Sequence, residues 1–413
     1  MFSAPVFAEG SLSIQKAINL AVDYNIELKQ AAMERDAANA RTDQAYAAYW
    51  PKIDLIAKTD NKRIAQDADY VASLDQQSQI SAALLYTLYD FGARSAEVDA
   101  ARYSLEGTEV KESLQKEALF FDTFKAFIQY DFANLNYELS RQYLNDVNQL
   151  HMLIKERVNA GFSPKSDKVR GELTVSEASS LVETARKGVT DSLIVLSNIT
   201  GVNPKEIDSI LYAPFRIEKD VESITINSNV NNPSIKVMLT NVKMYESKTA
   251  SLQAERYPKI QLVGTYRHDF NREYFPGSEA YIQLVVPLTD GGLLRSQVRE
   301  SVNNYGIAKL MLEKTYRDLD KRQRDFINIY NSTYDKLIID IASAEQAKKT
   351  LDIYQSEFSL GSRPLIDLIN TQKDLLNANV NILNDKMNLY LAMVALYNLN
   401  GDTMSGLNKL ARK

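Results

Sequence analysis

The sequence predicts a mainly α-helical protein that also carries four transmembrane β-strands and consists of two internal structural repeats. Only 15 Gly and 10 Pro occur in 413 residues, so long segments can continue as helix without a break. Four short segments alternate apolar and polar residues, which is the period of a β-strand with two different faces. Motifs of the first half return about 200 positions later in the second half, which indicates a duplicated structural plan.

The composition excludes several functional classes. No segment approaches the ~20 consecutive apolar residues that a membrane-spanning helix needs. The net charge of −5 gives no electrostatic attraction for nucleic acid. The chain has no Cys, and His151 and His268, its two His residues, lie 117 positions apart. Because no nucleophile, base or phosphate-binding signature clusters in the sequence, we expect no enzymatic activity, no metal and no other cofactor.

The first eight residues resemble the end of a secretory signal. Val6-Phe7-Ala8 has the small-residue pattern of a cleavage site, and cleavage there would leave Glu9 at the mature N-terminus. A mildly apolar, disordered tail is the alternative. With the absence of Cys, this segment favours an exported protein.

Four pairs of motifs define the repeats: LYDFG (88–92) with LTDGG (288–292), AGFSPKSD (160–167) with LGSRPLID (360–367), LSNITG (196–201) with LYNLNG (396–401), and YWPKIDLIA (49–57) with RYPKIQLVG (256–264). The first three pairs are offset by 200 positions and the last by 207, so a hairpin loop differs in length. The predicted organisation is a first repeat over 9–201, a linker over 202–230, a second repeat over 231–401 and a C-terminal tail over 402–413.

Each repeat is predicted to run helix, β-hairpin, long helix, helix. In the first repeat the segment from Ser11 to Tyr49 is rich in good helix formers, and Pro51 stops it. The predicted hairpins cover 52–90 and 259–290.

Within the hairpins, the apolar residues keep one phase along each strand. They are Ile53, Leu55 and Ala57; Ile80, Ala82, Leu84, Tyr86 and Leu88; Ile260, Leu262, Gly264 and Tyr266; and Ile282, Leu284, Val286 and Leu288. Strands of roughly 10 residues with this alternation suit a tilted membrane strand, with one face toward lipid and one toward a lumen.

Aromatic residues gather at the ends of these strands, as a membrane-interface girdle does. The members are Tyr46, Tyr49, Trp50, Tyr89, Phe91 and Tyr257. Amphipathic rings prefer the headgroup level of a bilayer. The alternative is a set of core aromatics beneath the sheet of a soluble protein.

The helix that follows the first hairpin has no Pro from Ala93 to Ala160 and would reach ~100 Å at 1.5 Å per residue. Phe121, Phe132, Tyr143 and Ile154 recur along it at intervals of eleven. An eleven-residue period favours nearly straight side-by-side packing over the left-handed supercoil of a heptad repeat. Such helices can form the wall of a wide tube, or a soluble bundle of long amphipathic helices.

Four strands cannot close a barrel, and an open edge in lipid leaves backbone groups without hydrogen bonds. Further copies of the chain must therefore supply the missing strands. Three copies would give twelve strands and an aqueous lumen, although two or four copies would also give even numbers.

With these motifs in this order, residues 11–401 resemble the TolC-like outer-membrane channel family, also called outer membrane factors. The resemblance rests on the duplicated plan, on PKI at the start of a strand, on LYDFG and LTDGG at strand ends, and on the Gly-x-x-Pro breaks. It implies a homotrimer with a twelve-stranded β-barrel in the outer membrane, surrounded by lipid. A long α-helical barrel then extends into the periplasm of a Gram-negative cell. It also implies two partners, a periplasmic adaptor (membrane fusion) protein and an inner-membrane ABC or other transporter.

The family closes its periplasmic end at a constriction lined by Asp, and that motif matches residues 361–370. By this resemblance Asp367 is the outer constriction aspartate, and Asn370 stands where the family has the inner one. The alternative for Asp367 is a helix-start residue after Pro364, which complements the helix dipole.

The resemblance also implies links that hold the constriction closed. Arg363 matches an arginine that tethers the inner helix to the outer pair, and Ser166 and Asp167 match its partners. Phe358 replaces a tyrosine whose hydroxyl takes part in the same tether. We therefore expect a constriction that is less acidic and less tightly tethered than the family pattern.

The function expected from the resemblance is a passive exit duct of a tripartite export machine. Type I protein secretion is the favoured use, because the chain ends soon after Gly401 without a long extension. Multidrug efflux is the close alternative. A soluble coiled-coil scaffold is the alternative from another class.

Assembly gives the first testable prediction. A sheet with two open edges should not persist as a folded monomer in detergent, because its edge N–H and C=O groups lack partners. The mass of the detergent-solubilised protein should correspond to three chains. A monodisperse monomer that retains β-structure would contradict the predicted architecture.

Overall fold

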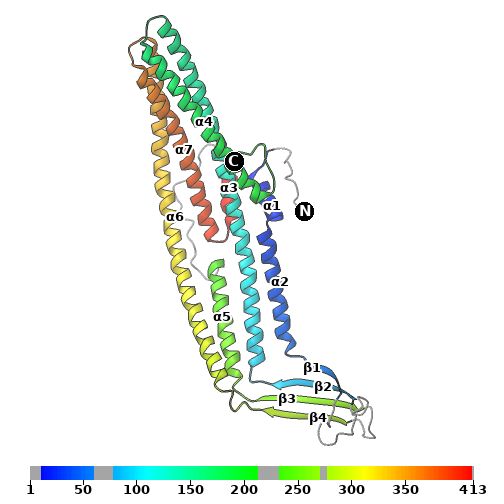
Figure 1. Cartoon of the computed structure of the whole chain (residues 1–413). Helices are drawn as coiled ribbons and strands as arrows, with labels where there is room; N and C mark the ends of the chain where they lie inside the picture. Colours follow the sequence, from blue (N-terminus) through cyan, green and yellow to red (C-terminus); the bar gives the residue numbers. More distant parts are fainter. Residues whose placement is uncertain (1–10, 60–77, 213–231, 270–276, 412–413) are drawn as a thin grey trace. The chain divides into compact units, whose positions relative to one another are not determined.

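The computed structural model describes residues 11–59, 78–212, 232–269 and 277–411. The predicted signal-peptide end (1–8) and most of the predicted linker lie outside them. Described elements are α1 (Ile14–Tyr24), α2 (Ile26–Ala47), β1 (Lys52–Thr59), β2 (Ser78–Tyr89), α3 (Ala93–Asn159), α4 (Lys165–Thr200), α5 (Pro233–Ala254), β3 (Lys259–Asp269), β4 (Gly277–Val285), α6 (Leu293–Ser359), α7 (Leu365–Leu399) and α8 (Thr403–Ala411) (Figure 1). The described helices include none that is long and apolar enough to cross a membrane.

The chain divides into two compact units, and each contains parts of both predicted repeats. We call Met1–Gln30, Ser113–Pro233 and Arg317–Lys413 the helical unit, and Ala31–Glu112 and Ser234–Tyr316 the sheet unit. The repeat boundaries themselves stay a prediction.

The core of the helical unit joins residues far apart in the sequence. Ile18 of α1, Phe124 and Ile128 of α3, Tyr330 of α6 and Leu389 of α7 are buried together. Of the residues predicted at intervals of eleven on α3, Tyr143 and Ile154 are buried, and Phe121 and Phe132 pack partly buried against the core. The eleven-residue period therefore marks the face of α3 that packs inward.

The first predicted helix is interrupted, so a single continuous helix from Ser11 to Tyr49 is wrong. Asn25 leaves the helical conformation with ψ 125°, and this ends α1. Its side-chain Oδ1 then accepts the backbone N–H of Leu28 at 2.6 Å, which caps the start of α2. A residue with a short polar side chain thus both ends one helix and begins the next.

The four strands form one antiparallel sheet in the order β1-β2-β3-β4. The central pairing, β2 with β3, joins the two hairpins and therefore the two repeats. β4 ends at Val285, so the predicted extension to residue 290 is wrong. Pro287 explains the early end, because it has no N–H to donate to a neighbouring strand.

The register confirms the predicted phase of the apolar residues that are paired in the strands, whereas Val286 and Leu288 lie beyond the end of β4. Ile53, Leu84, Gly264 and Ala280 lie side by side across the four strands. We call their side of the sheet the apolar face; it also carries Leu55, Ala82, Tyr86, Leu262, Ile282 and Leu284. Leu88 lies where the register shifts between Thr87 and Tyr89, and it has no paired position.

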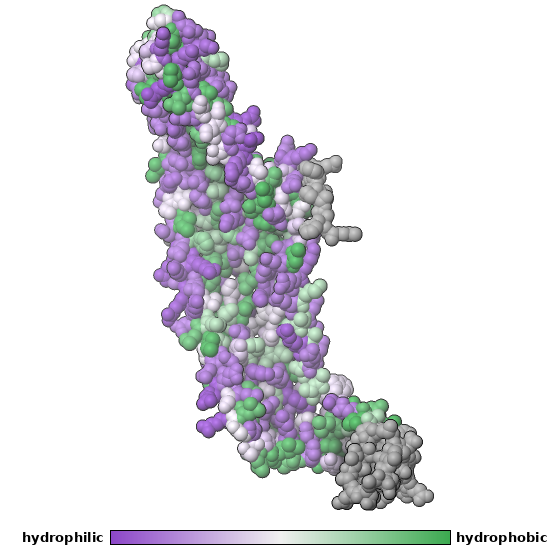
Figure 2. Space-filling model, in the orientation of Figure 1, coloured by the Kyte–Doolittle hydropathy of each residue, from purple (hydrophilic) through white to green (hydrophobic). Residues whose placement is uncertain are grey.

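The other side of the sheet, the polar face, carries most of the charged and amide residues. They include Lys52, Asp54, Ser81, Thr87, Lys259, Gln261, Arg267, Glu279 and Gln283. Gln283 donates a hydrogen bond to Gln261 across β3 and β4 at 3.0 Å. Figure 2 shows apolar residues gathered over the sheet and the adjoining helix ends of the sheet unit.

Substitution by Arg should have different effects at two neighbouring leucines of β2, because these leucines lie on opposite faces of the sheet. Leu84→Arg places a charge on the apolar face, where a barrel near mid-membrane loses about 2–4 kcal/mol. Leu85→Arg places the same charge on the polar face and should be tolerated better. Unheated gel electrophoresis of the two variants should show less assembled trimer for Leu84→Arg alone. Equal damage by both substitutions would mean that the assignment of the faces is wrong.

Candidate functional site

Two helix reversals of the same design lie in the helical unit, and they carry the predicted constriction and tether residues. The α3–α4 and α6–α7 connections each contain a Gly in the left-handed region, Gly161 and Gly361, both at φ 76°. The N–H of Phe162 bonds to the carbonyl of Arg157, and that of Ser362 bonds to the carbonyl of Glu357. This six-residue closure satisfies carbonyls at a helix end, and only Gly adopts its left-handed residue without strain.

Asp167 and Asp367 both lie in the first turn of the helix after each reversal. A carboxylate there complements the partial positive charge of the helix N-terminus. Asp367 and Asn370 are three residues apart on α7 and share a face, because side chains at this spacing are neighbours. Asn370 is exposed, whereas Leu368 and Ile369 are buried. The face with Asp367 and Asn370 therefore points away from the core of the chain.

Arg363 lies at the centre of a charged cluster at the start of α7. Its guanidinium donates to the Glu357 carboxylate at 2.8 Å and to the Asp367 carboxylate at 3.2 Å. The guanidinium also stacks 4.0 Å from the centre of the Tyr354 ring. Asp367 is thus paired with a cation within its own chain.

Sequence reasoning missed Glu357. It precedes Arg363 by six residues, across the reversal, so helical spacing gave no signal for the pair. The reversal brings the end of α6 over the start of α7, and only this folded turn makes Glu357 a partner of Arg363.

Within the described part of one chain, Arg363 is not joined to the other predicted tether residues. Arg363 bonds to Glu357 and Asp367 of its own chain rather than to Ser166 or Asp167. The link of Arg363 to Ser166 and Asp167 stays a prediction.

Phe358 is buried at 4% exposure in a cluster with Leu150, Ile154 and Leu368. Arg157 of α3 covers its ring, with the guanidinium carbon 5.0 Å from the ring centre. Arg157 also donates to the carbonyls of Phe358 and Ser359 at 3.1 and 3.2 Å. This arginine therefore links α3 to the end of α6 at the position where the expected tyrosine is missing.

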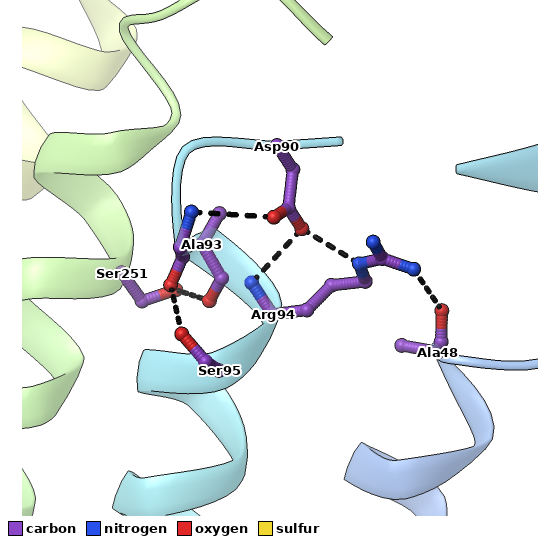
Figure 3. A network of polar contacts seen from close by, with 7 residues as sticks. Ala48, Asp90, Ala93, Arg94, Ser95 and Ser251 are labelled. Carbon is purple, nitrogen blue, oxygen red and sulfur yellow. Dashed lines mark hydrogen bonds and ion pairs between the residues drawn. The ribbon is translucent and has the colours of Figure 1, made fainter. Parts of the chain in front are cut away.

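The sheet unit carries the predicted aromatic girdle, and its first strand-to-helix turn is held by Arg94 (Figure 3). Asp90 accepts the backbone N–H of Arg94 at 3.0 Å and the Arg94 side-chain Nε at 2.8 Å. The same guanidinium donates to the carbonyl of Ala48 at 3.2 Å and lies 4.8 Å from the Tyr49 ring centre. Arg94 thus fastens the end of α2 to the start of α3.

Phe91 adopts φ 54°, a conformation that costs a bulky residue energy. Its ring lies 4.8 Å from that of Tyr89 and 5.2 Å from that of Tyr257, which offsets part of this strain. Trp50, another member of the girdle, is 76% exposed. The structure therefore brings three of the predicted aromatics, Tyr89, Phe91 and Tyr257, into one cluster.

The second repeat keeps the aspartate and the glycine two residues after it, but it lacks the aromatic ring and the arginine of this turn. Asp290 accepts the N–H groups of Leu294 and Gly292 at 2.7 and 2.9 Å, and these bonds hold the pKa of its carboxyl below the ordinary value. Gly291 replaces Phe91 at φ 68°, and Leu294 replaces Arg94. The capping carboxylate and the glycine that donates to it are therefore shared by both copies of the motif.

Known proteins that resemble this chain over most of its length are outer membrane proteins, in agreement with the two-faced sheet. The family model described as "Outer membrane efflux protein" matches residues 17–202 and 227–402. The outer membrane protein TolC of Vibrio cholerae is 22% identical over 408 residues, covering 95% of this chain and 91% of the relative. TolC of Escherichia coli is 20% identical, covering 98% and 87%.

Solved structures share the fold. The outer membrane protein VceC of Vibrio cholerae superposes with a TM-score of 0.82 at 15% identity, covering 94% of this chain and 96% of VceC. The open state of the MtrE outer membrane channel of Neisseria gonorrhoeae superposes with a TM-score of 0.81 at 14% identity, covering 98% and 95%.

Proposed function

Because this chain belongs to the outer membrane efflux protein family, we propose that it is the passive exit duct of a tripartite export machine. It is a TolC-type channel protein of the outer membrane that extends into the periplasm, and it is not an enzyme. Its fold is that of a trimeric channel, in which four strands from each of three copies form the barrel and long helices continue it.

The observation that carries this function is the sheet with one apolar and one polar face. A soluble coiled-coil scaffold has no use for an apolar face with Ile53, Ile282 and Leu284, which are exposed in the single chain. Lipid covers such a face, and the polar face then surrounds water. When the strands of several copies close into a barrel, the polar face lines a water-filled passage for polar solutes.

A passive duct needs partners that supply energy and substrate. We propose a periplasmic adaptor protein and an inner-membrane ABC or other transporter as these partners. The chain itself offers no nucleotide-binding signature in its sequence, which agrees with a duct that takes its driving force from elsewhere.

For the exported substrate we propose proteins secreted by the type I route. A constriction with Asn370 in place of a second acid carries less charge, and so it opposes a polypeptide of mixed charge less strongly. Multidrug efflux is the second candidate, favoured by the description of the matching family.

Deletion of the gene separates these two uses. Type I secretion predicts that specific proteins disappear from the culture medium of the source bacterium, while its sensitivity to dyes, detergents and antibiotics stays unchanged. The measurement is a comparison of the secreted proteins and of growth inhibition, with a plasmid-borne copy as control. Several-fold greater drug sensitivity with an unchanged set of secreted proteins would favour efflux instead.

We also propose that three copies of Asp367 and Asn370 form the narrowest ring of the duct. Both residues face away from the core, and Asp367 is 37% exposed in the single chain. Arg363 neutralises part of the charge, because it pairs with both Asp367 and Glu357. Two carboxylates and one guanidinium per chain leave a net negative ring that attracts cations.

Two substitutions in this cluster should shift ion selectivity in opposite directions. Asp367→Asn removes one carboxylate per chain and should lower the preference for cations. Arg363→Ser leaves Glu357 and Asp367 unpaired and should raise that preference, with a higher conductance. Reversal potentials and conductance of single channels in planar bilayers measure both effects. Glu345→Gln, a charge loss of the same size farther along α6, serves as control; selectivity unchanged by Asp367→Asn would place the constriction elsewhere.

A further inference from the structure

The sheet unit contains a cavity of about 1290 Å³ beside the first residues of β1 and β3 and the last residues of β2. It is lined by the ends of α2, α3 and α5, and the strands contribute Lys52, Leu85, Thr87 and Lys259. By the strand register all four lie on the polar face. The cavity therefore opens on the side of the sheet that faces the lumen in the proposed duct.

The wall of this cavity is largely apolar. Trp50, Leu85, Met244 and Leu252 contribute large side chains, and several alanines of α2 and α3 add small ones. Ligand sites of this size commonly combine such a wall with a few polar groups that fix orientation. The wall fits an aromatic or hydrocarbon body.

The polar groups around the cavity are mostly cationic. Five cations, Arg41, Lys52, Arg94, Lys248 and Lys259, stand against three carboxylates, Asp90, Glu97 and Glu255. Arg94 pairs with Asp90, Lys248 with Glu97 at 2.8 Å, and Lys52 with Asp54.

Two of these cations remain available for a ligand. In the part of the chain that the structure describes, Arg41 and Lys259 have no ion-pair partner within 4.0 Å. Arg41 is exposed on α2, and Lys259 is half-buried at the first position of β3. Glu255 is the one further carboxylate of the lining, so these two cations exceed it and the cavity has a net positive charge.

We propose that this cavity is a binding site for small anionic amphiphiles, with an apolar body against the wall and a sulfonate or carboxylate near Arg41 and Lys259. The proposal rests on the proposed function, because the lumen is what brings such molecules to the polar face. Membrane lipid is a less suitable occupant, since lipid meets the apolar face. The site would hold amphiphilic anions in the duct where the helices meet the strands.

Trp50 makes a direct test practical. It is the single Trp of the chain and lines the cavity, so energy transfer from its fluorescence reports on this part of the molecule. The purified protein in neutral dodecyl maltoside is titrated with 8-anilino-1-naphthalenesulfonate. The matched probe is N-phenyl-1-naphthylamine, which has the same rings without the sulfonate. We expect saturable transfer to the sulfonate probe with at least about tenfold tighter binding than for the uncharged probe.

Variants then assign the charge recognition. Arg41→Gln combined with Lys259→Gln should weaken binding of the sulfonate probe about tenfold and leave the uncharged probe unchanged. The control Lys187→Gln removes an exposed charge on α4 and should change neither. Arg41→Lys combined with Lys259→Arg should keep binding. If the double glutamine variant does not assemble on unheated gels, each single substitution is titrated instead, with about threefold weakening expected.

Three results would overturn the site. They are equal affinity for the two probes, an unchanged sulfonate affinity in the glutamine variants, and equal losses for both probes. None of them touches the export function, which the gene deletion tests separately. If deletion of the gene abolishes secretion and any of these results is obtained, the binding site is removed and the duct remains.

Discussion

The constraint on which this structure depends is that, among the described residues, β1 and β4 each have one backbone edge without a paired strand. Inside a bilayer no water satisfies those N–H and C=O groups, so they must bond to strands of other copies. The single chain therefore carries an incomplete sheet, with Lys52–Thr59 and Gly277–Val285 at its borders. Trimeric closure gives the apolar face a lipid surface and the polar face a lumen. The contact of the apolar face with lipid and of the polar face with the lumen therefore both depend on this closure.

The duplicated plan shows which parts of a motif the fold requires and which are optional. Both strand-to-helix turns keep an aspartate, Asp90 or Asp290, that accepts N–H groups at the start of a long helix. Only the first turn adds Arg94 and the ring of Phe91, which tie it to the end of α2 and to neighbouring aromatics. Capping is thus common to both turns because each long helix begins with unsatisfied donors. Of the two described turns, only the one in the first repeat has this arginine and this aromatic ring.

The helix reversals of the helical unit follow the same logic with a different chemistry. Gly161 and Gly361 allow the chain to turn, and arginines secure the result: Arg157 holds the end of α6, and Arg363 joins Glu357 to Asp367. At Phe358 the guanidinium of Arg157 lies over the phenyl ring.

The sequence by itself determined the features that depend on residues close together in the chain. It located the long helices, the four strands, the phase of their apolar residues and the repeated turns, because each is set by neighbours within a few residues. Pro287 could also have placed the end of β4. Only the tertiary structure decided that β2 pairs with β3 and that Arg41 and Lys259 line one cavity. It also decided that Glu357 pairs with Arg363 and that Arg157 binds the end of α6. Those contacts depend on how distant segments pack, and no local pattern in the chain records which distant residue will be adjacent.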